Sequence, residues 1–488
     1  MLKDIKNILR QSALYGFSRI SAKLAGFILL PFISLKLDIS SYGYIVLTES
    51  LWQILWAVFL FGLESGVIRW YTLISEDIRR KKFLFSVLLF VIVFNFICLL
   101  ILWATSSALT EFIYGNIDYR YLLIYAGIIA SVEAVTFIIF LIIRIEEKVK
   151  LYTAFAVIIT CLTLCMQLYS LYFMEDKLGG IFLAKILAPL AGVLMLTPYI
   201  IKKIKLGFDQ ENILQLIRYS FPIMLASLLG TFLNHQDRYI LGKFTDSTSV
   251  GLYGLAYNIT GIVNFLLISP FSLAFSVISW KKLKDENAER FFTKTVTYVF
   301  FTVIYFSLAL ALFIPHLIKL FTFRTEYWAA SEYLPIIILS TPFYAVQTIG
   351  VFSFYVTKNT RYILIIYLIT VLVNFMLNII LIPLSGIYGV CISNVLAFFT
   401  LSLLTYIFSR NNYFFRYEWM KIFKMITCVI FIILPFHYID IDSKPLLITL
   451  KLIALCMFPI FLYVFKFYEP IELTTLKNYL RKYLQYNH

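Results

Sequence analysis

Charged residues are scarce in this chain. Only 14% of its 488 residues are Asp, Glu, Lys or Arg, whereas 61% are hydrophobic. Soluble domains usually carry about 25% charged residues, so this composition excludes a soluble domain. The chain is therefore expected to be a polytopic membrane protein.

Histidine and cysteine are also few, at four and six. No His, Cys and carboxylate residues cluster with metal-ligand spacing, and all six cysteines fall within apolar stretches. A Walker A motif is missing, so ATP hydrolysis is not encoded. The polar breaks between apolar stretches are too short for a catalytic domain. We therefore expect no enzyme activity, no metal and no cofactor.

What the chain does have is a series of apolar runs. A helix of about 20 apolar residues spans a bilayer, and about fourteen such runs recur, which predicts an all-α membrane protein. The predicted spans are Ser12–Leu35, Tyr44–Leu63, Phe83–Ala104, Tyr121–Ile143, Thr153–Phe173, Ile181–Ile201, Tyr219–Leu241, Leu252–Ile278, Val296–Ile314, Leu334–Val356, Ile363–Ile382, Ile387–Phe408, Ile422–Phe436 and Leu447–Phe465.

The net charge of +15 is distributed unevenly. Basic residues gather in alternate loops, such as Arg79–Lys82 and Lys202–Lys205, while the intervening loops carry scattered cations. The positive-inside rule then places both termini in the cytoplasm. Topology explains most of the excess charge, so we expect no nucleic-acid partner.

An internal repeat predicts two halves. Tyr15-Gly16-Phe17 precedes Ala22 and Gly26, and Tyr219-Ser220-Phe221 precedes Ala226 and Gly230 at the same spacing. Repeats of this kind are common in secondary transporters. We predict six-helix bundles over residues 1–205 and 206–410, followed by two additional helices and a basic cytoplasmic tail over 411–488.

Cations within the spans point to an anionic cargo. Arg19 and Lys23 lie one turn apart in the first span and share a helix face with Gly26. Charges in hydrocarbon are costly, so they usually line a substrate pathway. Lys185 and Arg238 are further candidates for this cationic lumen, although Lys185 could instead snorkel to the interface and Arg238 could pair with Asp237.

Carboxylates within or near the spans leave alternatives open. Glu133 lies mid-span with no cation beside it, so it either pairs with Arg19 or Lys23 or couples transport to a proton or sodium gradient. Glu64 and Arg69 lie at a helix end, where pairing with another helix or with lipid headgroups is the favoured interpretation.

Three segments resemble signatures of bacterial polysaccharide-biosynthesis flippases. They are Leu60–Tyr71 (LFGLESGVIRWY), Asp237–Phe244 (DRYILGKF) with Val250–Tyr257 after it, and Asn374–Pro383 (NFMLNIILIP) with Gly386–Ser393 after it. Their order and spacing resemble Wzx-type O-antigen flippases of the superfamily that also includes MATE exporters and lipid II flippases.

This resemblance implies a MATE-like fold and alternating access in the bacterial cytoplasmic membrane. The implied cargo is an undecaprenyl-pyrophosphate-linked oligosaccharide, an O-antigen, capsule or exopolysaccharide unit, moved from the cytoplasmic to the periplasmic face. It also implies a polysaccharide polymerase and chain-length machinery as partners. The alternatives are a lipid II flippase, an ion-coupled exporter of small molecules and, less favoured, a membrane-embedded polymerase.

Overall fold

A computed structural model describes residues 21, 23–283, 285–413, 415–438, 444–470 and 474. Within these residues every regular element is a helix. After a helical segment at 23–36, the elements are α2 (Ile39–Phe59), α3 (Leu63–Leu73), α4 (Asp77–Ala104), α5 (Ser106–Tyr114), η1 (Ile117–Tyr119), α6 (Arg120–Ile145), α7 (Val149–Phe173), α8 (Lys177–Ile201), α9 (Gln210–Phe244), α10 (Ser247–Val263), η2 (Asn264–Ile268), α11 (Ser269–Lys282), α12 (Ala288–Phe321), η3 (Thr325–Ala329), α13 (Ala330–Ile337), α14 (Ser340–Gly350), α15 (Phe352–Val356), α16 (Arg361–Ser385), α17 (Ile387–Ser409), α18 (Trp419–Tyr438) and α19 (Lys444–Val464).

The described residues contain 12 helices long and apolar enough to cross a membrane, and a bent helix pair between Thr325 and Val356 makes up to 13. About fourteen spans are predicted from the sequence. The difference lies at the first span, Ser12–Leu35, most of whose first half is outside the described residues. The prediction of a multi-pass helical membrane protein is confirmed.

Several elements differ from the sequence prediction. The second span breaks at Gly62, whose φ of +64° is left-handed and whose Cβ would lie 2.7 Å from the Met224 backbone nitrogen. Residues 105–120, predicted as a loop, contain α5. Helix α9 begins at Gln210 rather than near Tyr219, and its 35 residues extend about 52 Å, well beyond the hydrocarbon core.

Residue contacts divide the chain into two compact units. Unit 1 comprises Met1–Gly254, Lys319–Ala329 and Tyr367–Val390, and unit 2 comprises Leu255–Ile318, Ala330–Ile366 and Cys391–His488. The predicted bundle boundaries after residues 205 and 410 stay a prediction.

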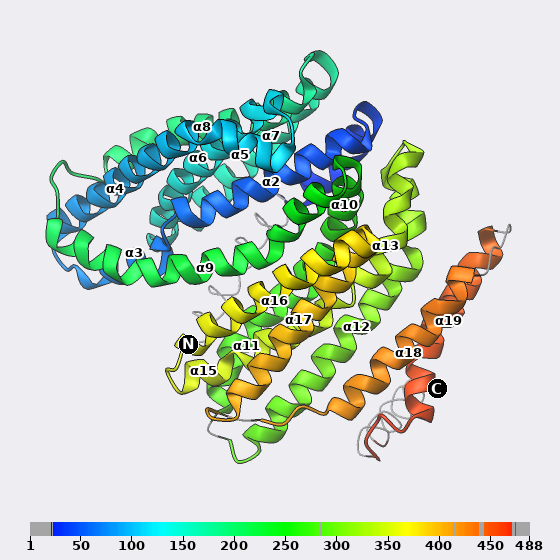
Figure 1. Ribbon diagram of the computed structural model, residues 1–488. Helices are drawn as coiled ribbons and strands as arrows, with labels where there is room; N and C mark the ends of the chain where they lie inside the picture. The colour runs from blue at the N-terminus through cyan, green and yellow to red at the C-terminus, as the bar shows by residue number, and fades with distance from the viewer. Residues whose placement is uncertain are drawn as a thin grey trace, which may run out of the picture. The chain divides into compact units, whose positions relative to one another are not determined.

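Small residues bring the helices of unit 1 together around α6. Ala126, Ala130 and Ala134 recur every four residues on one face of α6, and each is fully buried. Helix association inside lipid relies on close packing, because the lipid chains are as apolar as the side chains. Helices α2, α4 and α8 pack against α6, as Figure 1 shows.

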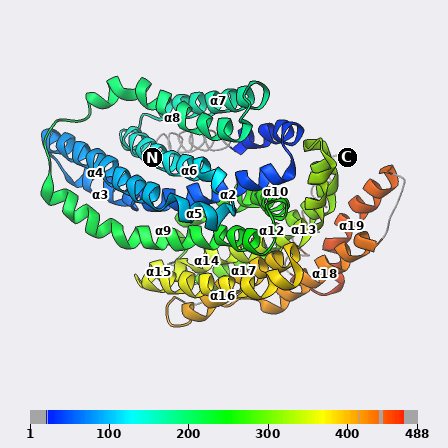
Figure 2. The ribbon, with the colours of Figure 1, turned by 45° about the horizontal axis from the view of Figure 1, so that its top comes forward.

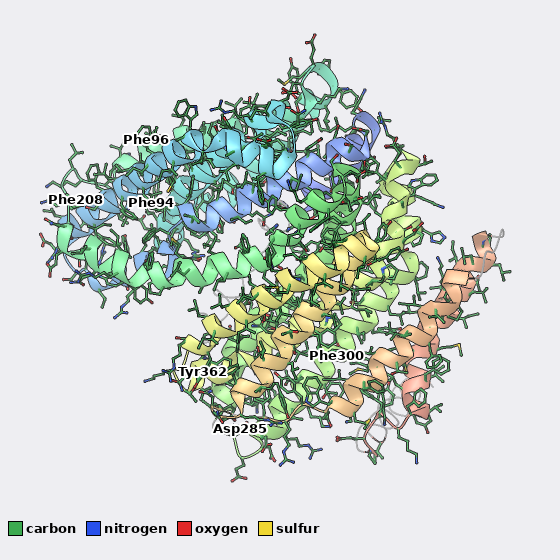
Figure 3. All side chains as sticks on the ribbon, viewed as in Figure 1. Phe94, Phe96, Phe208, Asp285, Phe300 and Tyr362 are labelled. Carbon is green, nitrogen blue, oxygen red and sulfur yellow. The ribbon has the colours of Figure 1, made fainter. Side chains whose placement is uncertain are left out.

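In unit 2 the long helix α12 supplies much of the core. Phe300 of α12 is fully buried, whereas Phe96 on α4 of unit 1 is 60% exposed; both are labelled in Figure 3. Exposed aromatics of the second kind suit a lipid-facing surface. Helices α18 and α19 pack against each other as a hairpin (Figure 2).

The starts of α2 and α10 meet in unit 1. Asp38 caps α2 by accepting from the Ser41 amide, and Asp246 accepts from the Ser249 amide at the start of α10. The hydroxyl oxygens of Ser40 and Ser247 lie 2.6 Å apart. Each Asp cap fixes the local geometry of its own turn, and the contact between Ser40 and Ser247 joins the two turns.

Candidate functional site

Lys185 forms an ion pair inside the membrane-spanning part of unit 1. Its Nζ lies 2.5 Å from Oε1 of Glu49 and 4.6 Å from the ring centre of Trp52. Lys185 is in the first half of α8, and Glu49 is near the middle of α2. A cation at this depth is tolerated when it is paired, and the indole ring adds a cation–π contact.

Glu133 of α6 joins the same group. Its Oε2 accepts a hydrogen bond of 2.8 Å from the indole nitrogen of Trp52. Trp52 lies three residues after Glu49, so both project from one face of α2. Glu49, Trp52, Glu133 and Lys185 are called the polar cluster below. It holds two carboxyl groups and one ammonium.

The neighbouring face of α2 is bonded to α9. His235 Nδ1 lies 3.2 Å from Ser50 Oγ, and its Nε2 lies 3.1 Å from Gln53 Oε1. The imidazole can therefore donate through one nitrogen and accept through the other. Helix α2 thus carries polar contacts on both sides within the span.

Arg238 and Asp237 make a buried pair on α9. Arg238 Nη1 donates to Asp237 Oδ1 at 3.0 Å and to the Asn234 carbonyl at 2.5 Å. The Tyr253 hydroxyl donates to the other oxygen of Asp237. The exposed fractions of Arg238 and Asp237 are 2% and 0%. Several hydrogen bonds to each group offset the cost of burying both charges.

The predicted cationic stripe is described only in part. Arg19 lies outside the described residues, and Lys23 is exposed. A Cβ built on Gly26 would meet no atom within 4 Å, so the face that carries Lys23 is not packed at this position. The structure thus describes Lys23 without Arg19, so the cationic stripe and its pairing with Glu133 stay a prediction.

Glu64 and Arg69 find separate partners. Glu64 Oε1 lies 2.7 Å from Nη2 of Arg144 on α6. The Arg69 guanidinium lies 5.3 Å from the Trp70 ring centre and 5.4 Å from that of Tyr219 on α9. Both residues thus contact other helices.

A charged network joins the connections next to these residues. Glu146, between α6 and α7, accepts from Lys203 Nζ at 2.7 Å and from the Tyr199 hydroxyl at 2.7 Å. Burial opposes ionisation, but these hydrogen bonds hold the pKa of the Glu146 carboxyl below its ordinary value. This carboxylate links two basic loops that the charge pattern assigns to one side of the membrane.

Sequence reasoning missed Glu49, Trp52 and His235. Glu49 lies inside the predicted span Tyr44–Leu63, so the criterion that selected Glu133 would also have found it. Among the described residues, no three His, Cys, Asp or Glu side chains gather as a metal site would require.

The sequence model of a family described as "Polysaccharide biosynthesis protein" matches residues 8–279, and a second model, MatE, matches residues 222–380. No curated protein matches the chain.

Solved transporter structures share its fold. One is "Lipid II flippase MurJ, inward closed conformation", with a TM-score of 0.73 and 16% identity, covering 94% of this chain and 99% of that one. An inward-facing multidrug MATE family transporter of the MOP superfamily has a TM-score of 0.60 and 16% identity, covering 81% of this chain and 97% of that one. The MATE multidrug transporter DinF-BH has a TM-score of 0.57 and 16% identity, covering 82% of this chain and 93% of that one. The predicted MATE-like fold is confirmed.

Proposed function

Because the chain belongs to the polysaccharide biosynthesis protein family, we propose that it is a flippase for an undecaprenyl-pyrophosphate-linked oligosaccharide. The cargo is the repeat unit of a surface polysaccharide, and it crosses the bacterial cytoplasmic membrane by alternating access. The polymerase and chain-length machinery then act on it at the outer face.

The observation that carries this proposal is the ion pair of Lys185 inside the membrane-spanning part of α8. A phosphate of the cargo can take the place of its carboxylate partner, Glu49. Its side chain is 17% exposed and that of Glu49 is 30% exposed, so the pair is open to a competing anion. A pyrophosphate loses its hydration inside the membrane, and charge-assisted hydrogen bonds from Lys185 compensate part of that loss.

The other predicted cations take complementary roles in the proposal. Lys23 and Arg19 on the first span provide further contacts to the anionic headgroup. Arg238 is bonded to Asp237 and the Asn234 carbonyl of its own helix in this conformation, so it meets cargo only after rearrangement. Glu64 and Arg69 hold helix ends together through Arg144 and Tyr219.

The carboxyl groups of the polar cluster supply a route to ion coupling. When pyrophosphate binds Lys185, Glu49 loses its cationic partner. An unpaired carboxylate at this depth is costly, which favours uptake of a proton or a sodium ion by Glu49 or Glu133. Release of that ion on the opposite side would restore the ion pair with Lys185 and reset the cycle.

Reconstituted vesicles test the proposal. We would measure how fast an undecaprenyl-pyrophosphate disaccharide becomes accessible to periodate, comparing wild type with Lys185→Gln and Lys185→Arg. Lys185→Gln should lower the rate at least about tenfold, the equivalent of one lost charge-assisted hydrogen bond, and Lys185→Arg should keep most of it. Lys177→Gln, at the first residue of the same helix, is the matched control.

Two further substrates separate the alternatives. Lipid II in the same vesicles tests the peptidoglycan-precursor alternative, and a cationic dye tests the exporter alternative. Faster movement of lipid II than of the disaccharide would change the assigned cargo. Movement of the dye alone, or full activity in Lys185→Gln, would contradict the anion-binding role.

A further inference from the structure

A groove of about 710 Å³ lies within unit 2, whereas the polar cluster belongs to unit 1. One wall is the π-helical segment η2 with the start of α11, and the other is the first half of α12. Pro270 explains the irregular wall, because it lacks the N–H that would continue regular α-helical bonding, and π-helical turns often mark functional sites.

The groove changes character along its length. Leu267, Phe271, Tyr298 and Thr302 line the part that runs along the span, and Arg290 and Lys294 line the end near the start of α12. From Arg290 to Thr302 the helix rises about 18 Å, which is close to the depth of one bilayer leaflet. An apolar trough with cations at one end matches an amphiphile with an anionic head.

The charges at this end do not cancel. Lys294 Nζ lies 2.9 Å from Glu418 and also contacts Glu469, while Lys421 lies 3.0 Å from Glu418. Arg290 Nη2 is 3.3 Å from Glu469. Among the described residues, three cations therefore face two carboxylates, so the group has an excess positive charge. Asp285, labelled in Figure 3, lies in the turn between α11 and α12. Its carboxylate oxygen lies 2.7 Å from Nζ of Lys282, so these two charges pair with each other.

Arg290 is the cation open to a ligand. Its side chain is 65% exposed, whereas that of Lys294 is 19% exposed and held by two carboxylates. A guanidinium can bind a phosphate through two parallel hydrogen bonds. The arrangement leaves Arg290 to contact a headgroup at the membrane surface while Lys294 adds to the local positive potential.

We propose that this groove binds an anionic phospholipid of the leaflet next to the turn between α11 and α12, which the positive-inside rule assigns to the cytoplasm because Lys281, Lys282 and Arg290 flank it. The phosphate contacts Arg290, with Lys294 behind it, and one acyl chain lies along Leu267, Phe271 and Tyr298. This site is independent of the cargo, and it places a lipid against the network that ties Glu418 and Glu469, on either side of the α18–α19 hairpin, to α12.

Native mass spectrometry of the full chain tests the site. Wild type should retain phosphatidylglycerol in preference to phosphatidylcholine. Arg290→Gln should lower retention of phosphatidylglycerol about fivefold, the contribution of one cation near a membrane surface. Lys281→Gln removes an exposed cation that does not line the groove, and it should retain the lipid as wild type does.

A second pair of variants tests the apolar part. Thr302→Trp should fill the groove and reduce retention of the lipid, whereas Leu273→Trp, on the exposed side of α11, should not. Melting temperatures check that each variant is folded. Equal retention of both lipids, or wild-type retention in Arg290→Gln, would overturn the site. Preferential displacement by undecaprenyl phosphate would assign the groove to the carrier lipid instead.

The outcome does not depend on the proposed transport activity. Selective lipid retention in a protein that moves no glycolipid would reject the flippase and keep the lipid site. Glycolipid movement without selective lipid retention would keep the flippase and reject the lipid site.

Discussion

One side chain of α2 connects the charged residues of the polar cluster inside the membrane. Trp52 is central, because its ring faces Lys185 and its N–H donates to Glu133. Replacing it with Phe would keep an aromatic ring beside the ammonium and remove the donor. We expect Trp52→Phe to lower the free energy of unfolding by about 1 to 3 kcal/mol, since it leaves the carboxyl of Glu133 without this partner.

Thermal unfolding in detergent measures this effect. Trp56→Phe is the control, because Trp56 lies one turn further on the same helix and packs edge-on against Phe137. Equal melting temperatures for the two variants would show that the indole N–H does not matter.

The residue types of this site could be predicted better than their partners. Glu133 and Lys185 stand out because charges inside apolar runs are rare. Their shared contact with α2 depends on how α2, α6 and α8 pack, and no spacing in the sequence shows that. The same limit applies to Tyr253, which reaches Asp237 from the next helix.

The carboxyl of Glu146 gives stability a pH dependence. Its pKa in the folded protein is below its ordinary value of 4.5. The unfolded chain therefore binds this proton more readily, so the stabilisation is present above pH 4.5 and is lost as pH falls through the folded pKa. Glu146→Gln should lower stability by about 1 kcal/mol at pH 7 and by much less near pH 3.

Melting temperatures of both proteins across that range measure this effect. Glu147→Gln, at the exposed neighbouring residue, should follow wild type. A constant difference between Glu146→Gln and wild type from pH 7 to pH 3 would argue against this titration.

At the level of elements, glycine decides how closely α2 and α10 approach. A Cβ on Gly251 would lie 2.4 Å from the Ile39 carbonyl oxygen and 3.1 Å from the Gly43 nitrogen. Backbone atoms cannot rotate away as a side chain can. Gly251→Ala should therefore separate the helices and lower the free energy of unfolding by about 1 to 3 kcal/mol or more.

Gly261 offers a matched control on α10. A Cβ there would meet nothing within 4 Å. Gly261→Ala should be neutral or stabilising by up to about 1 kcal/mol, since alanine favours the helix. Similar effects of the two substitutions on unfolding would contradict the close packing.

The sequence predicted which helices exist more completely than where each helix begins and ends. Apolar runs marked the spans, but the polar first turns of α9 and α12 lie before those runs and gave no such signal. The break at Gly62 depends on the neighbouring backbone of α9, which the sequence of α2 does not contain. The internal repeat predicted two halves but did not predict that the turns at the starts of α2 and α10 touch.

For the whole molecule, loops of one charge class gather at one end of unit 1. The Lys205 amide donates to the Lys81 carbonyl at 3.3 Å, and Lys203 binds Glu146. The turns at the starts of α2 and α10 form a separate set of contacts in unit 1. There the Tyr327 hydroxyl donates to the Leu37 and Asp38 carbonyls, at 3.2 Å each. These basic connections therefore lie together, and their assignment to the cytoplasmic side stays a prediction.

We expect the contact between the starts of α2 and α10 to open during alternating access in the proposed flippase. A disulfide can hold it shut, because the Ser40 and Ser247 hydroxyl oxygens are 2.6 Å apart. We expect Ser40→Cys with Ser247→Cys to form a disulfide on oxidation and to reduce glycolipid movement in vesicles to background, with recovery after reduction.

Each single cysteine variant is the control for that experiment, in a background where the exposed Cys161, Cys165 and Cys456 are replaced by serine. Both single variants should transport under oxidising conditions, because neither can close the bridge. Full transport by the oxidised double variant would mean that these turns stay together throughout the cycle. Cargo would then have to leave by a route that does not separate α2 from α10, and this contact would serve as a fixed pivot.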